Sequence, residues 1–294
     1  MTTGTAVDIL ILGAGWTSTF LIPLCVQNNL TCAATTRSGS GSTIQFSFDP
    51  TSDDPEPYKG LPDAKTVLVS FPIVGSGASE RLVTLYRGTR HGEGQEAGFI
   101  QLGTTSIWDK APETLASLGL GGTFYDRHSP FTLTGRSNAE AELLTLSRTT
   151  VLNLAGLWGG QRVVKNWLGR VAPTKEALKA KGSIHLIHGL DLARAILAVH
   201  SAFDKAAGQR WLLTDGRVYD WWDLASAWGD EDGPARWVRE LMQEEEVRVL
   251  PRNTELLGRV LDSREFWSTF GLSPLKARLE TELTRSEGEV LKGS

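Results

Sequence analysis

The clearest chemical signal in the sequence is the glycine-rich segment ILILGAGWTSTF, which lies close to the start of the chain. Gly13 and Gly15 match the first two positions of the dinucleotide-binding pattern Gly-x-Gly-x-x-Gly, whereas Ser18 stands at the third. The first glycine of that pattern permits a tight turn, the second lets a pyrophosphate approach the backbone, and the third allows close helix–strand packing. Ser18 therefore alters a packing position and removes no phosphate donor. We expect the turn and the free N–H groups of the following helix to bind a cofactor, and the alternative is a tight turn without a ligand. The binding residues are then Gly13, Gly15, Trp16 and Thr17.

The segment AATTRSGSGS, which follows the second expected strand, bears on the choice of dinucleotide. An NAD site has an acidic residue about 20 positions after the first glycine, where it holds the ribose 2′-hydroxyl. This segment has no acid and offers Arg37 and Ser38 instead. A guanidinium beside hydroxyl groups suits a 2′-phosphate, so NADP(H) is favoured over NAD(H). The alternative for Arg37 is a solvated loop cation. Phe71 and Pro72, at the end of the fourth expected strand, complete the candidate cofactor contacts.

Short apolar strands alternate with helices along the first two thirds of the chain. Strands are expected at 7–13, 30–37, 43–49, 65–72, 98–106, 149–159 and 210–216, and helices at 16–29, 76–89, 137–147 and the end of 184–203. Residues 50–63 are expected to form a loop. Pro23 costs ~3 kcal/mol inside a helix, so we expect a kink or a short first segment there. Ser137 is the expected N-cap of its helix. The alternation predicts an α/β fold, a Rossmann-type doubly wound parallel sheet with helices on both faces.

Composition limits the organisation and the partners. We expect a dinucleotide-binding domain at 1–165, to which 184–214 returns, and a smaller, tryptophan-rich substrate domain at 166–183 and 215–294. The net charge of −4 argues against nucleic acid and anionic membranes as partners. Without a secretory signal or an apolar span, a cytoplasmic protein is expected. Two cysteines and no Cys/His cluster predict reduced thiols and no metal site.

Five segments in order resemble the extended short-chain dehydrogenase/reductases of the NAD-dependent epimerase/dehydratase type. They are GAGWTS, FIQLGTTSIWD, NLAGLWGGQR, IHLIHGLDLARAI and LLTDGRVYDWWDLASAW. The resemblance implies chemistry by a Ser or Thr together with a Tyr-x-x-x-Lys pair, and Thr104 matches the Ser/Thr. Aligned through Ser137 and Glu142, the Tyr position holds Thr134 and the Lys position holds Asn138. Neither side chain titrates usefully near neutral pH, so the chain resembles the atypical branch that lacks the usual active-site pair.

Other groups can replace the missing tyrosine. The segment TFYDRHSPF supplies Tyr125 and His128, which we expect near Thr104 as acid or base; the alternative is a polar loop that caps the site. Arg136 can pair with a substrate carboxylate or phosphate, or it is a surface cation at a helix start. The segment 275–285 is either a solvated helix face or a homodimer contact.

Three functions remain open from the sequence. The first is an NADP(H)-dependent oxidoreductase, epimerase or non-redox isomerase or cyclase that acts on a small, largely apolar molecule, with Thr104 as the orienting residue. The second is a non-catalytic nicotinamide-nucleotide sensor similar to the NmrA-like proteins. The third is a scaffold that keeps the fold for stability alone.

Overall fold

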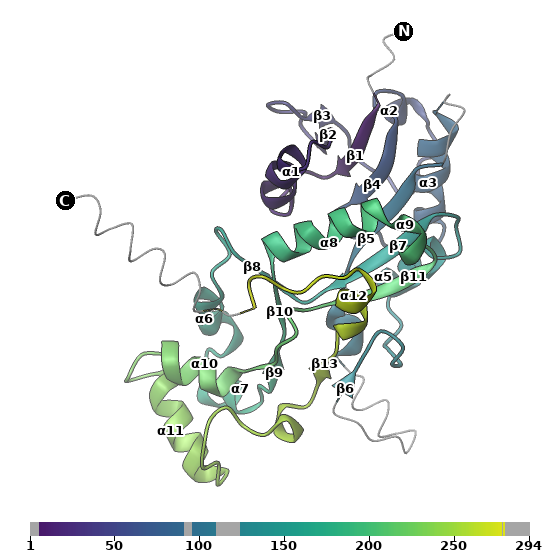
Figure 1. Ribbon diagram of the computed structural model, residues 1–294. Helices are drawn as coiled ribbons and strands as arrows, with labels where there is room; N and C mark the ends of the chain where they lie inside the picture. Colours follow the sequence, from purple (N-terminus) through teal and green to yellow (C-terminus); the bar gives the residue numbers. More distant parts are fainter. Residues whose placement is uncertain (1–5, 91–95, 110–123, 278, 280–294) are drawn as a thin grey trace, which may run out of the picture.

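The computed structural model describes residues 6–90, 96–109, 124–277 and 279. Its centre is a parallel sheet of seven strands in the order β11-β7-β5-β4-β1-β2-β3 (Figure 1). The strands are β1 (Val7–Leu12), β2 (Cys32–Thr36), β3 (Ile44–Gln45), β4 (Ala64–Val69), β5 (Gly98–Thr104), β7 (Thr149–Leu154) and β11 (Gln209–Leu213). Helices cover both faces, so the expected Rossmann-type α/β fold is confirmed.

Two core clusters, one on each face of the sheet, follow from the alternation of side chains along a strand. In β1, Ile9 and Ile11 join the cluster under α1 (Ser18–Gln27) and α8 (Gly189–Ser201), while Leu10 and Leu12 join the cluster under α3 (Ala78–Gly88) and α5 (Gly135–Leu143). Both faces of the strand are buried, which explains its continuous apolar run.

Several expected elements differ in extent. The strand expected at 43–49 is reduced to the two-residue edge strand β3, and the loop expected at 50–63 contains the short helix α2 (Glu56–Lys59). The strand expected at 149–159 is two strands, because β7 pairs within the main sheet whereas β8 (Gly156–Trp158) pairs with β10 (Leu186–His188). A continuous apolar run does not reveal where a strand changes partner.

One helix expectation was wrong and one is met in neither direction. Helix α1 is assigned as one segment from Ser18 to Gln27 with the exposed Pro23 inside it, so a short first segment is absent and the kink stays a prediction. The N-cap of α5 is Thr134 and not Ser137. The two residues form a capping box, in which the Thr134 hydroxyl accepts from the Ser137 N–H at 3.0 Å and the Ser137 hydroxyl accepts from the Thr134 N–H at 2.7 Å.

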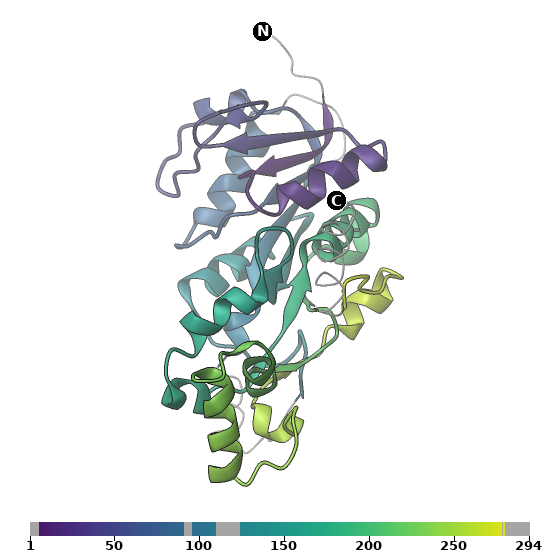
Figure 2. The ribbon, with the colours of Figure 1, turned by 90° about the vertical axis from the view of Figure 1, so that its left-hand side faces the viewer.

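A second assembly lies at the opposite end of the molecule from β1 and β2, as both views show (Figures 1 and 2). Its buried cluster includes Trp158, Trp221 and Trp222. Its elements are α6 (Leu168–Val171), α7 (Lys175–Lys179), α10 (Trp221–Trp228), α11 (Pro234–Glu244), the 3₁₀ helix η2 (Val164–Trp167) and the pair β9 (Ser183–Ile184) and β12 (Tyr219–Asp220). The division into two domains stays a prediction.

The chain then returns to the main sheet. Helix α12 (Arg264–Thr269) packs Phe266 against Trp211 of β11, with ring centroids 5.7 Å apart. Strand β13 (Val260–Leu261) pairs with β6 (Phe124–Tyr125). The remaining elements are α9 (Phe203–Ala206) and the 3₁₀ helices η1 (Thr105–Trp108) and η3 (Thr254–Leu257). Most of the segment 275–285, where we expected a helix, lies outside the described residues.

The described residues were searched for membrane-spanning helices, metal-binding groups and disulfide bonds. Across those ranges, no helix has the length and apolar character that a membrane crossing needs, and no group of His, Cys, Asp and Glu side chains could hold a metal ion. Cys25 and Cys32 are both free thiols.

Candidate functional site

A cleft runs along the carboxyl ends of the sheet strands, at the point where the strand order reverses between β1 and β4. It consists of two cavities that share Gly15, Ser70 and Pro72. The large cavity, of about 830 Å³, extends toward the end of β2. The small cavity, of about 380 Å³, extends toward the ends of β5 and β7. The two meet at the glycine-rich turn between β1 and α1.

The two glycines of the turn have different roles. Gly13 has a φ of +89°, and a Cβ there would lie 2.9 Å from the Ser70 hydroxyl oxygen. Its N–H donates to the Thr35 hydroxyl oxygen at 3.0 Å, which ties the turn to β2. A Cβ at Gly15 would meet no atom within 4 Å, because this residue faces open space in the cleft. Gly13 therefore shapes the turn, and Gly15 leaves room for a ligand.

The backbone beyond Gly15 forms a cradle of unused donors. In the part of the chain that the structure describes, the N–H groups of Gly15, Trp16 and Thr17 have no acceptor. The Ser18 side chain points inward, and its hydroxyl donates to the Gly15 carbonyl at 2.5 Å. Ser18 thus closes the turn and leaves the three donors available to an anion.

The neighbouring helix α3 provides a useful contrast. Its first turn is satisfied from within the protein, because the Glu142 carboxylate accepts from the Gly77 N–H at 2.7 Å and from the Glu80 N–H at 3.0 Å. Helix α1 has no such carboxylate, no side-chain cap and no acid in its first turn. The positive end of the α1 dipole is therefore available to a ligand, whereas that of α3 is already neutralised.

The large cavity combines a cation with aromatic walls. Arg37 and Ser38 line its far end, where Arg37 is exposed and no carboxylate of the described chain pairs with it. Phe48 and Phe71 line the same cavity and stack on each other at a centroid distance of 6.0 Å. No Asp or Glu occurs among its described lining residues. This surface suits a flat ring together with a phosphate.

The small cavity has two guanidinium groups at its wall, together with the hydroxyl groups of Thr17, Ser70 and Thr104. Thr104, at the end of β5, lies there with Arg136 of α5 and Arg162 of the turn after β8. The Thr104 hydroxyl is 3.2 Å from the Ser106 hydroxyl. The Trp16 ring supports Arg162, whose guanidinium lies 4.4 Å from the ring centroid. The Trp16 indole N–H in turn donates to the Gly159 carbonyl at 3.1 Å.

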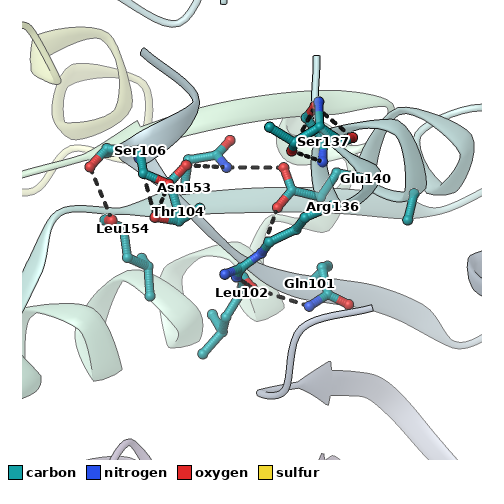
Figure 3. Close-up of polar contacts among 12 residues, drawn as sticks. Gln101, Leu102, Thr104, Ser106, Arg136, Ser137, Glu140, Asn153 and Leu154 are labelled. Atoms are coloured by element: carbon teal, nitrogen blue, oxygen red, sulfur yellow. Dashed lines mark hydrogen bonds and ion pairs between the residues drawn. The ribbon is translucent and has the colours of Figure 1, made fainter. Parts of the chain in front are cut away.

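A buried polar network lies behind Thr104 (Figure 3). Glu140 lies between Arg136 and Asn153, at 3.3 Å from Arg136 Nε and 3.1 Å from Asn153 Nδ2. Arg210 forms an ion pair with the same carboxylate and donates to Asn153 Oδ1 at 2.9 Å. Asn153 also donates to the Thr104 carbonyl at 3.1 Å. The network fixes α5 relative to β5 and β7 and so fixes the wall of the small cavity.

Comparisons with known proteins agree with this architecture. No protein-family model matches the chain, and neither does any curated protein. Among solved structures, UDP-N-acetylglucosamine 4-epimerase from Bacillus cereus is 12% identical, with a TM-score of 0.60 over 92% of this chain and 94% of that chain. A short-chain dehydrogenase/reductase superfamily protein from Agrobacterium tumefaciens with bound NAD is 11% identical, with a TM-score of 0.61 over 97% and 98%. RMD from Pseudomonas aeruginosa in complex with NADPH is 13% identical, with a TM-score of 0.53 over 91% and 93%.

The chain shares its fold with these epimerase and short-chain dehydrogenase/reductase structures. At these identities the likeness concerns the fold, and the Tyr and Lys positions within it stay a prediction. Thr134 and Asn138, which we aligned with them, are exposed, and neither lines the small cavity. The Thr134 hydroxyl is engaged as the N-cap acceptor of α5. The described lining residues of the small cavity include no Tyr, Lys, His, Cys, Asp or Glu.

The structure does not bring Tyr125 and His128 to this cleft. Tyr125 is fully buried among Trp108, Leu212 and other apolar side chains, and burial raises the pKa of its hydroxyl. His128 is exposed, with Nε2 at 2.9 Å from a Glu265 carboxylate oxygen. Neither residue lines either cavity. The pairing of β6 with β13 holds this segment in the cluster of Ile107 and Trp108, outside both cavities, and no local sequence signal indicated that pairing.

The predicted cofactor residues and Thr104 do lie together along the cleft. The large cavity is lined by Gly13, Gly15, Arg37, Ser38, Phe71 and Pro72. The small cavity is lined by Gly15, Trp16, Thr17, Pro72 and Thr104. Sequence reasoning missed Arg162 and the aromatic residues Phe46 and Phe48 as lining residues. Arg162 follows a Gly-Gly pair after β8, a signal for a turn but not for a contact with Trp16.

Proposed function

We propose that the chain binds a nicotinamide dinucleotide in the cleft and prefers NADP(H) to NAD(H). The observation that carries this proposal is the open cradle of N–H groups at Gly15, Trp16 and Thr17, at the junction of the two cavities. A pyrophosphate accepted there leaves the adenosine half for the large cavity and the nicotinamide half for the small one. The NAD and NADPH present in two of the similar structures support this cofactor class.

The preference for NADP(H) rests on the end of β2. Arg37 and Ser38 offer a guanidinium and a hydroxyl to a 2′-phosphate, and Arg37 needs to give up no ion pair within the described chain to do so. The segment from Cys32 to Ser40 contains no acid that would accept the ribose 2′-hydroxyl of NAD.

The small cavity bears on what the protein does with the nucleotide. Bound NADP(H) would supply hydride chemistry there, and the Thr104 hydroxyl could orient a carbonyl oxygen. A reductase or epimerase also needs a proton donor, and the described lining offers only hydroxyl and guanidinium groups. This observation favours the second candidate, a protein that binds NADP(H) and a further ligand without side-chain proton transfer. An oxidoreductase, epimerase or isomerase would have to take its proton from water or from its ligand.

Calorimetric titration with NADPH, NADP+, NADH and NAD+ tests the binding proposal. Gly15→Asp adds a carboxylate to the cradle at a position where the fold has room, so it should abolish binding by charge repulsion. Gly60→Asp is the matched control, since Gly60 has a φ of −77° and no atom within 4 Å of a Cβ. Wild-type protein that binds none of the four nucleotides, or a Gly15→Asp variant that binds as well as Gly60→Asp, would refute the proposal.

A second assay separates the two uses of the nucleotide. NADPH oxidation is followed with a panel of aldehydes and ketones, in protein already shown to bind NADPH. A non-catalytic binding protein gives no consumption above the rate without protein, whereas turnover on any carbonyl supports the enzyme. The expected cytoplasmic location and the expected homodimer stay predictions. Sedimentation velocity tests the homodimer.

A further inference from the structure

The charges around the small cavity are not balanced by the chain itself. The whole protein carries 34 acidic and 30 basic side chains, yet the two charged residues in the described lining of this cavity are Arg136 and Arg162. A cavity that is positive inside a chain of net charge −4 concentrates anions locally. The imbalance points to a ligand that brings the negative charge.

Arg136 is held in position with one nitrogen to spare. Its Nη2 donates to the Leu102 carbonyl at 2.7 Å, and its Nε lies 3.3 Å from a Glu140 carboxylate oxygen. Its Nη1 has no partner among the described residues. Glu140 also pairs with Arg210, so one carboxylate serves two guanidinium groups and the cluster keeps a net charge of +1 beside the cavity.

Arg162 provides the second positive group from a different element. It stacks on the Trp16 ring at 4.4 Å, is exposed, and pairs with no carboxylate of the described chain. Stacking on an aromatic face fixes a guanidinium without using its N–H donors, so all of them remain available to a ligand.

Apart from the two arginines and the hydroxyl groups of Thr17, Ser70 and Thr104, the side chains of the described cavity wall are apolar. Leu102, Leu154, Leu157 and Pro72 line it, together with the Trp16 ring. The volume of about 380 Å³ is shared with the nicotinamide half of the proposed nucleotide, so a second ligand in this cavity has to be small. A ligand that fits both surfaces has an apolar body and one carboxylate, which matches the planar N–H pairs of a guanidinium.

We infer that the small cavity binds a small organic carboxylate between Arg136 and Arg162. The inference names the ligand class for the site proposed above and rests on that proposed function for the nucleotide beside it. The rival source of negative charge is the pyrophosphate of the nucleotide itself, because Arg162 lies over the same Trp16 whose N–H belongs to the cradle.

Benzoate is the probe, and benzamide is its neutral control of the same shape. Binding of each is measured calorimetrically in the presence of saturating NADP+ and again without nucleotide. We expect benzoate to bind at least about tenfold more tightly than benzamide, the factor that corresponds to one charge-assisted hydrogen bond. Equal binding of the two probes, or no binding of benzoate under either condition, overturns the inference.

Three variants assign the effect to the arginines. Arg162→Ala and Arg136→Gln should each weaken benzoate binding about tenfold and change NADP+ affinity by less than about twofold. Arg170→Ala is the matched control, because Arg170 is exposed and lines neither cavity. If Arg136→Gln fails to fold, Arg162→Ala still tests whether an arginine of this cavity binds benzoate, because it removes an exposed side chain.

The two proposals fail in different ways. Loss of NADP+ affinity with unchanged benzoate affinity in these variants would assign the guanidinium groups to the pyrophosphate and overturn the inference while sparing nucleotide binding. Benzoate binding that depends on both arginines in a protein that binds no nucleotide would support the inference and refute the proposed function.

Discussion

Arg37→Ala should weaken NADP+ binding about tenfold and leave NAD+ binding unchanged. In the structure Arg37 is exposed at the end of β2 and has no carboxylate partner among the described residues. Its removal should therefore cost the fold nothing and take one guanidinium away from the 2′-phosphate of the proposed cofactor. A hydrogen bond to a charged group contributes about 1.5–3 kcal/mol. The lower value applies here because solvent screens an exposed pair, and about 1.5 kcal/mol corresponds to roughly a tenfold change in Kd.

The measurement is a pair of calorimetric titrations, with NADP+ and with NAD+, at low and at physiological salt. The loss for NADP+ should be larger at low salt, because the interaction is between exposed charges. Arg37→Glu should go further and shift the preference toward NAD+, since an acid at this strand end is what an NAD site uses. Equal losses for both nucleotides would refute the assignment of Arg37 to the 2′-phosphate, and so would no loss for either.

Three further predictions concern the fold. Gly13→Ala should lower the free energy of unfolding by about 1–3 kcal/mol, because of its φ of +89° and its contact with Ser70, whereas Gly15→Ala should leave stability unchanged and weaken nucleotide binding. Burial raises the pKa of Asp215 to about 7 from 3.8, so the contribution of Asp215 to stability should be lost as the pH rises from about 4 to 7. The free energy of unfolding of the wild type relative to that of Asp215→Asn should therefore fall over this range. Arg210→Met should cost about 3 kcal/mol, because it leaves the Glu140 carboxylate buried with one partner fewer.

Urea unfolding measures all three, at pH 5 and pH 8 for Asp215. The sign for Asp215 follows from a folded-state pKa above the unfolded one: the folded protein keeps the proton that the unfolded chain has released, so the stabilising contribution is complete below about pH 4 and gone above pH 7. Parallel pH profiles for wild type and Asp215→Asn would contradict this account. Equal midpoints for Gly13→Ala and Gly15→Ala would contradict the different roles of the two glycines, and a cost below about 1 kcal/mol for Arg210→Met would contradict the importance of the network.

The sequence predicted those strands, turns and helices that depend on residues a few positions apart along the chain. The strand β1, the turn at Gly13 and Gly15 and the helix α1 follow one another within a few residues, and each restricts the next. Errors arose where two local rules compete. Thr134 and Ser137 are both good N-cap residues, and the reciprocal hydrogen bonds of a capping box decide between them.

The features that sequence could not predict depend on contacts between distant residues. Trp16 and Arg162 meet only because the turn after β8 folds over α1, and Glu140 and Arg210 meet only because α5 crosses the sheet near β11. The same reason removed Tyr125 from the site, since its pairing partner in β13 lies far along the chain. Secondary-structure propensity and hydrophobic periodicity describe residues that are close along the chain, so they do not predict such pairs.

Thr134, which we aligned with the family's tyrosine, has a structural role that a tyrosine could not fill. The Thr134 hydroxyl caps α5, and a cap of this kind contributes about 1 kcal/mol to stability. The same helix carries Arg136 to the small cavity and Glu140 to the network behind it. The side chain that α5 presents to the small cavity is a guanidinium, which can orient an anion beside a nucleotide but cannot exchange a proton with it at neutral pH. If the small cavity supports a reaction, the side chains of α5 contribute electrostatic orientation, and the proton must come from elsewhere.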